Sequence, residues 1–143
     1  MTHPPRSGVT LIELLITISI VGILGAIAYP SYQTQMLRTR RAAAAGCLME
    51  YAQYMERVYT GNLRYDQNDG AATALPTLNC ATDSSPSYGF AFASGQPQQR
   101  SYTLQAAPRG VQASRDTACA TLGLTQTGTK TISGSGTVAD CWK

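Results

Sequence analysis

Apolar residues are concentrated near the amino end of the chain. Val9 to Tyr29 covers 21 positions, and Glu13 is the only charged residue among them. At about 1.5 Å per residue, a helix of this length spans about 31 Å, close to the ~30 Å hydrocarbon layer of a bilayer. The pattern therefore predicts a membrane-spanning helix with an acid in its first turn.

The helical pattern continues beyond this apolar stretch. After Pro30, apolar residues recur at intervals of three, four or seven, which places them on one helix face: Leu37, Ala44, Leu48, Tyr51, Met55 and Tyr59. Gly61-Asn62 then supplies a stop signal. We expect one helix from Val9 to about residue 60, kinked at Pro30 because proline lacks an amide donor and crowds the preceding turn.

The remaining sequence predicts a loop followed by an antiparallel sheet. Residues 62–86 show little periodicity and many turn formers. Bulky and small or polar residues alternate in Tyr88–Phe92 and in Ser101–Ala107, and Thr121–Ser133 predicts two strands around a turn at Thr127-Gly128. The expected fold class is α+β: a long membrane-spanning helix that continues into a small antiparallel sheet over residues 88–133.

Cysteines and charges give opposite indications about the membrane side. The four cysteines, an even number without a CxxC pair, favour disulfides in an oxidising compartment: Cys47, Cys80, Cys119 and Cys141. The formal net charge is only +3, and its one local cluster, which lies just beyond the apolar stretch, favours the cytoplasmic side: Arg38, Arg40 and Arg41. We give the cysteines more weight.

Enzymatic chemistry is not expected. The only histidine is His3, so a mature chain that starts at Val9 lacks an imidazole for a catalytic triad or for most zinc sites. Asp66 and Asp69 lack the later glutamate of a calcium loop. We therefore expect a structural subunit with no catalytic residues, no cofactor and no metal.

The stretch GVTLIELL combines features of a processing site. Gly8 has no side chain, so a protease can approach its backbone, and cleavage after it would leave Val9 as a new terminal amine. A lone carboxylate such as Glu13 costs several kcal/mol in hydrocarbon unless it is paired. A terminal amine of its own or a neighbouring copy can pair with it and so set the register between helices. A cleaved secretory signal peptide, or an acid that only stabilises the helix dipole, remains the alternative.

The segment GVTLIELLITISIVGILGAIAYPSY resembles the amino-terminal signature of type IV pilins. This resemblance implies that a prepilin peptidase cuts between Gly8 and Val9 and N-methylates Val9, which stands where phenylalanine is usual. It also implies that Glu13 is needed for assembly. Gly22 and Pro30 match positions where the stalk helix loosens in filaments.

The segment CATLGLTQTGTKTISGSGTVADCW resembles the end of PilE-like and ComP-like minor pilins. The implied function is that of a minor pilin, a structural subunit that takes part in pilus assembly and in pilus-dependent motility, adhesion or DNA uptake. Its partners would be other pilins in a helical filament, the prepilin peptidase and the inner-membrane assembly machinery. The chain would cross the inner membrane once, with its head in the periplasm, and would lie in the extracellular pilus after assembly.

The expected domains follow from this resemblance. They are a leader over residues 1–8, a membrane and filament-core helix over 9–37, and a globular part over 38–143. Four cysteines permit three pairings. Cys119 and Cys141 flank the predicted hairpin, and the resemblance implies a cysteine-closed loop over 119–141. We predict this bond together with Cys47–Cys80, which would fasten the 62–86 loop to the helix.

Two other functions remain open. ComP-like pilins bind DNA during uptake, so the chain could be a competence receptor. Such a receptor needs basic residues to neutralise phosphates, and the candidates are Arg109, Arg115, Lys130 and Lys143. Tyr88 and Tyr102 could stack on bases, although aromatic residues in alternating strands are more often core. A type II secretion pseudopilin would share the amino-terminal motif but is less consistent with two disulfides.

Overall fold

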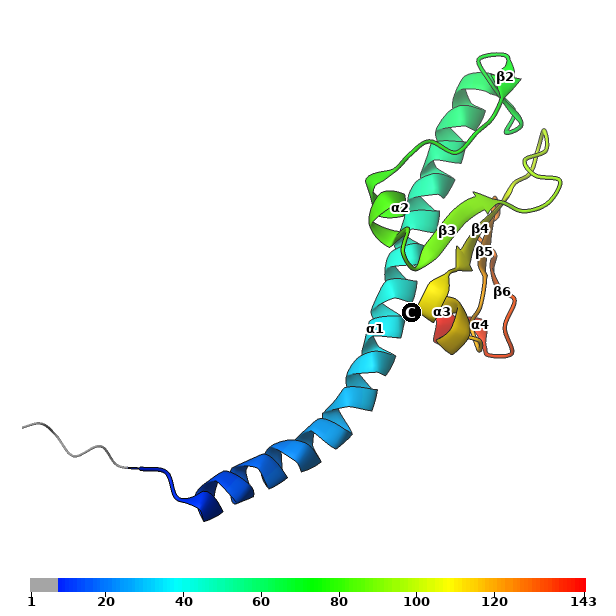
Figure 1. Ribbon diagram of the computed structural model, residues 1–143. Coiled ribbons are helices and arrows are strands. Elements are labelled where there is room, and N and C mark those ends of the chain that lie inside the picture. The colour runs from blue at the N-terminus through cyan, green and yellow to red at the C-terminus, as the bar shows by residue number, and fades with distance from the viewer. Residues whose placement is uncertain (1–7) are drawn as a thin grey trace, which may run out of the picture. The chain divides into compact units, whose positions relative to one another are not determined.

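The computed structural model describes residues 8–143 (Figure 1). Residues 1–7, which make up most of the predicted leader, lie outside the described part. The chain divides into two compact units, one that ends at Met36 and one over Leu37–Lys143. We call the second unit the head.

A single long helix, α1, runs over Leu11–Asn62 and passes through Pro30. Its bounds lie within about two residues of the predicted ones, and the kink at Pro30 stays a prediction. The part of α1 nearest its amino end is long and apolar enough to cross a membrane, with a mean hydropathy of 2.5 over its most apolar window. Buried α1 residues occur only in the head. Four stand at predicted positions, Ala44, Leu48, Tyr51 and Met55, and three were not predicted, Ala45, Cys47 and Val58. The predicted Leu37 and Tyr59 are only half-buried.

Four strands form an antiparallel sheet in chain order, β3-β4-β5-β6. They are β3 (Tyr88–Phe92), β4 (Thr103–Pro108), β5 (Leu122–Thr125) and β6 (Lys130–Ile132). The predicted turn between the last two is present, and Gly128 adopts a φ of +76° there, a conformation that costs glycine little. The α+β expectation is thus confirmed.

Several short elements were not predicted. The segment over residues 62–86 is not only a loop, because it contains a small hairpin and a helix, and the tail contains another helix. The elements are β1 (Gln67–Asn68), β2 (Ala71–Ala72), α2 (Asn79–Ser84), α3 (Gly110–Arg115) and α4 (Val138–Cys141). None is long enough for a helical or strand period to register. A disulfide holds each of α2 and α4, and in α4 the Thr137 side chain also accepts a hydrogen bond from the Asp140 amide.

The core of the head lies between α1 and the sheet. Leu48 and Met55 of α1 and Leu104 and Leu122 of the sheet are completely buried. Tyr88 and Tyr102 are also buried, at 1% and 2% exposure, so neither ring can stack on a DNA base. Both are core residues, the more common role for strand aromatics.

One acid on α1 organises the polar edge of this core. The Glu56 carboxylate accepts hydrogen bonds from the hydroxyls of Tyr65 and Tyr102, at 3.1 and 3.2 Å. Burial, reinforced by Glu56, raises the pKa of Tyr65 to about 12. Both hydroxyls therefore stay protonated at neutral pH and link α1 to the segments that follow it.

Candidate functional site

The predicted processing residues lie at the start of α1. Gly8 and Val9 precede the helix, and the Thr10 hydroxyl accepts a hydrogen bond from the Glu13 amide at 3.3 Å. This is the geometry of a helix amino-terminal cap, and the acid in the first turn favours the helix dipole. Within residues 8–143 the Glu13 carboxylate has no hydrogen bond or ion pair, so it remains available to a group outside the chain.

The apolar side chains around Glu13 are not covered by the chain itself. They are between 50% and 78% exposed from Leu11 to Ile27, and Gly22 lies on this same stretch of helix. An apolar surface of this extent is far larger than soluble monomers expose. This part of α1 therefore needs lipid or other apolar helices around it.

The structure contains both predicted disulfides. Cys47 of α1 is bonded to Cys80 of α2, and Cys119 is bonded to Cys141 of α4. The first bond fastens α2 to α1, and the second closes the chain around the β5–β6 hairpin. On the chain-entropy account, a crosslink over such loops contributes about 3 kcal/mol or somewhat more.

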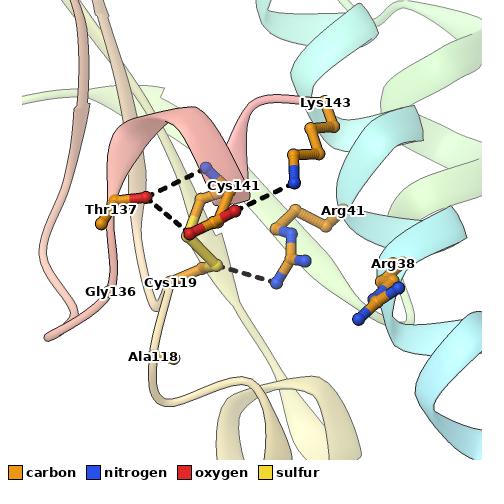
Figure 2. A pocket seen from close by; sticks show the side chains of 9 residues that line it. Arg38, Arg41, Ala118, Cys119, Gly136, Thr137, Cys141 and Lys143 are labelled. Carbon is orange, nitrogen blue, oxygen red and sulfur yellow. Dashed lines mark hydrogen bonds and ion pairs between the residues drawn. A yellow bond between two sulfur atoms is a disulfide. The ribbon is translucent and has the colours of Figure 1, made fainter.

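A pocket of about 340 Å³ lies beside the Cys119–Cys141 bond (Figure 2). Cations from two distant parts of the chain line it: Arg38 and Arg41, one turn apart on α1, and Lys143 at the carboxyl end. Thr137 and Asp140 complete its polar lining. We call this site the basic pocket.

Arg41 is fixed at the wall of the basic pocket. Its Nη1 donates to Asp116 Oδ1 at 2.5 Å and to Cys119 Sγ at 2.8 Å. Asp116 is 6% exposed and also accepts hydrogen bonds from Gln112 Nε2 and the Tyr88 hydroxyl. A buried carboxylate needs this compensation. Burial, with Asp116 close by, raises the pKa of Tyr88 to about 12, so its hydroxyl remains a donor.

The opposite wall of the basic pocket is a small network at the carboxyl end. Lys143 Nζ pairs with Asp140 Oδ1 at 2.9 Å, and the Thr137 hydroxyl donates to Asp140 Oδ2 at 2.7 Å. These contacts, first that with Lys143, hold the pKa of Asp140 below its usual value. Arg38 is exposed and makes no hydrogen bond or ion pair with any described residue, so its guanidinium is the cation most available to a ligand.

The four predicted DNA contacts do not form one cluster. Lys130 on β6 holds its Nζ 5.3 Å from the centre of the Trp142 ring, and Lys143 follows Trp142 in the chain. Arg109 instead covers Gly89 on β3, where an added Cβ would collide with its guanidinium. Strands β3 and β6 are the two opposite edges of the sheet.

Arg115 lies apart from the two lysines in sequence, at the exposed end of α3.

Sequence reasoning did not place Arg38 and Arg41 beside Lys143. The available signal is their one-turn spacing and the cluster that they form with Arg40, which by charge bias alone indicates only membrane orientation. Among residues 8–143 no group of three or more His, Cys, Asp or Glu side chains is arranged to hold a metal.

Two protein families match consecutive parts of the chain. The family described as "Type IV minor pilin ComP, DNA uptake sequence receptor" matches residues 30–123, about two thirds of the chain. The "Prokaryotic N-terminal methylation motif" matches residues 4–29. The first match ends before Lys130, Trp142 and Lys143.

Curated relatives are similar over about half of the chain. The fimbrial protein EcpC of Eikenella corrodens is 34% identical over 79 residues, which are 55% of this chain and 52% of EcpC. Prepilin peptidase-dependent protein D of Escherichia coli K12 is 35% identical over 75 residues, 50% of this chain and 49% of that protein. The chain spans about half the length of the curated relatives that it matches.

A solved structure is also similar to this chain. The Neisseria meningitidis non-core minor pilin PilV is 22% identical, with a TM-score of 0.49. The alignment covers 70% of this chain and 89% of PilV.

Proposed function

The chain belongs to the family described as "Type IV minor pilin ComP, DNA uptake sequence receptor", and we propose that it is made as a precursor and then processed. A prepilin peptidase cuts between Gly8 and Val9 and N-methylates Val9. The match to the N-terminal methylation motif supports this step and favours it over cleavage as an ordinary secretory signal. The family match likewise favours a pilin over a secretion pseudopilin.

Processing prepares the chain for two successive environments. Before assembly, the apolar part of α1 anchors it in the inner membrane, with the head in the periplasm, where the two disulfides form. During assembly, the same apolar surface packs against other pilins in a helical filament. The single observation that carries this proposal is the exposed apolar segment of α1, in which Glu13, four residues after Val9, has no ion pair with any residue of 8–143.

Processing can be tested by intact-mass measurement on filament protein and on membrane protein. The mature chain should begin at Val9 and carry one added methyl group on its terminal amine. In a strain that lacks the prepilin peptidase, the chain should keep residues 1–8 and stay in the membrane. A mature chain that begins after Ala28, as a signal peptidase would leave it, contradicts the proposal.

A second candidate function, DNA binding, is favoured by the description of the matched family. We propose that the end of the chain contributes to it. Lys130 and Lys143 supply two cations that can neutralise phosphates. Trp142 lies between them in the chain and offers a ring on which a base can stack. Its Nε1 donates to the Thr131 carbonyl at 3.1 Å, which holds the ring in place.

DNA binding can be measured by fluorescence anisotropy on the mature chain in detergent micelles with a labelled duplex. Affinity should fall steeply with added salt, and Lys130→Ala should reduce the slope of log K against log salt by about one. Arg57→Ala is the matched control, because it removes an exposed cation from α1 and not from β6, the strand that carries Lys130. Absence of binding at low salt, or an equal effect of both substitutions, rules out this assignment.

A further inference from the structure

The arginines that follow the apolar part of α1 are unusual for their proposed side of the membrane. Charge bias normally leaves such residues in the cytoplasm, whereas the disulfide-bonded head requires an oxidising compartment. The structure separates the three arginines by environment. Arg38 and Arg41 line the basic pocket, and Arg40 lines a different pocket together with Asp83.

We propose that the basic pocket binds the phosphate of an anionic glycerophospholipid from the membrane in which α1 is anchored. The inference rests on the proposed membrane anchoring; it shares Lys143 with the proposed DNA contact, whereas Arg38 and Arg41 belong to the basic pocket alone. The negative phosphate of a bound headgroup would compensate the positive charge of these arginines, which charge bias disfavours on the periplasmic side.

Chain distance places the arginines within reach of the membrane surface. Arg38 lies nine positions after Tyr29, the end of the apolar stretch, which is about 14 Å of helix axis. Side chains of a helix tilt toward its amino end, and long basic side chains extend along apolar surface to reach the polar interface. Arg38 is therefore close enough along the chain for a long basic side chain to reach a lipid headgroup.

The lining of the basic pocket suits one phosphodiester with a hydroxylated substituent. Arg38 offers an uncommitted guanidinium, and the two contacts of Arg41 with described residues both use Nη1, which leaves its other donors for a ligand. Lys143 adds an ammonium that is paired with Asp140 and has further N–H donors for a ligand. Asp140 adds a carboxylate that can accept a hydrogen bond from a glycerol hydroxyl.

The size of the pocket favours a single headgroup over a nucleic acid. Its volume, about 340 Å³, lies at the lower end of the roughly 300–1,000 Å³ of small-molecule sites. A DNA duplex is much too wide to enter, and Asp140 opposes a dense row of phosphates. The Cys119–Cys141 bond holds together the two segments of the chain that line this part of the basic pocket.

The test uses the full chain in detergent micelles, titrated with phosphatidylglycerol or phosphatidylcholine and followed by native mass spectrometry. We expect one phosphatidylglycerol per chain, bound about tenfold more tightly than phosphatidylcholine. Arg38→Gln and Lys143→Gln should each weaken this binding about tenfold, the usual effect of losing a charge-assisted hydrogen bond. Arg38→Lys should retain most of it.

Arg40→Gln is the matched control, because it removes the same charge from the same helix turn without touching the basic pocket. It should change the affinity less than twofold. An equal loss in Arg40→Gln and Arg38→Gln would mean general attraction to anionic surfaces and would overturn the proposal. Equal affinity for the two lipids would also overturn it.

Two competitors distinguish the possible sources of phosphate. Inorganic phosphate or a DNA duplex, added at the same concentration as the lipid, should not displace phosphatidylglycerol. Displacement by either would assign the pocket to that ligand and overturn the lipid proposal. Flotation with vesicles tests anchoring separately: a chain that floats with both vesicle types but lacks headgroup preference disproves this inference alone.

Discussion

Glu13→Ala is expected to enter the membrane as well as the natural chain but to be nearly absent from filaments. Glu13 is the only charge between Val9 and Tyr29, and its carboxylate has no partner among the described residues. Alanine removes the cost of burying a charge in lipid, so insertion should not suffer. In a filament, however, the lost pairing with the amine of a neighbouring Val9 should lower incorporation about tenfold or more.

Incorporation is measured by quantitative mass spectrometry of sheared filaments, relative to the amount of chain in the membrane. Glu13→Gln keeps the shape and hydrogen-bonding capacity but not the charge, and it should behave like alanine. Glu50→Ala removes an exposed acid from the head part of α1 and serves as the control. Normal incorporation of Glu13→Ala would leave the acid with only a local effect on the start of α1.

The elements that the sequence predicted are those with a long repeating pattern. The heptad-like spacing from Leu37 to Tyr59 identified the buried face of α1, because a face buried against a sheet must repeat with the helical period. The strands alternated clearly, and Gly128 marked their turn. The short helices α2 and α4 escaped because a disulfide or a cap, not a repeat, determines them.

The basic pocket could not be predicted from the sequence, because no repeating pattern connects the residues that line it. Lys143 lines the same pocket as Arg38 and Arg41, in a terminal segment that Cys141 ties to Cys119, whose Sγ accepts a hydrogen bond from Arg41 of α1. More than 100 residues separate them in the chain, so no local pattern joins them. The amino-terminal site, by contrast, depends on a contiguous run of residues, and Gly8, Val9 and Glu13 could be assigned from that run.

Gly134 lies where the terminal segment passes close to the chain around Cys119 of the Cys119–Cys141 disulfide. Gly134→Ala should destabilise the head by about 3 kcal/mol, the upper end of the usual range for overpacking. A Cβ at Gly134 would collide with the backbone of Thr117 and Ala118. Backbone atoms cannot rotate away as a side chain does, so the segment has to move as a whole.

This movement would break specific contacts around the disulfide loop. The Gly134 amide donates to the Cys119 carbonyl at 3.3 Å, and the Gly136 amide donates to the Ala118 carbonyl at 2.7 Å. Both bonds hold the terminal segment on the chain that precedes β5. Loss of the first bond leaves the carbonyl of the buried Cys119 without this donor, at a cost of about 1–3 kcal/mol, whereas Ala118 is exposed and its carbonyl can bond to water instead.

Urea unfolding of the full chain in detergent micelles, with both disulfides intact, measures the loss. Trp142 is the only tryptophan and lies in the affected segment, so its fluorescence reports the transition directly. Gly46→Ala is the matched control: apart from its chain neighbours and the backbone of its own helix, no atom lies within 4 Å of its added Cβ, and alanine in a helix should stabilise by about 0.5–1 kcal/mol. If Gly134→Ala unfolds at the same urea concentration as the natural chain, the segment has room to move, and its close approach to residues 117–119 does not hold the loop in place.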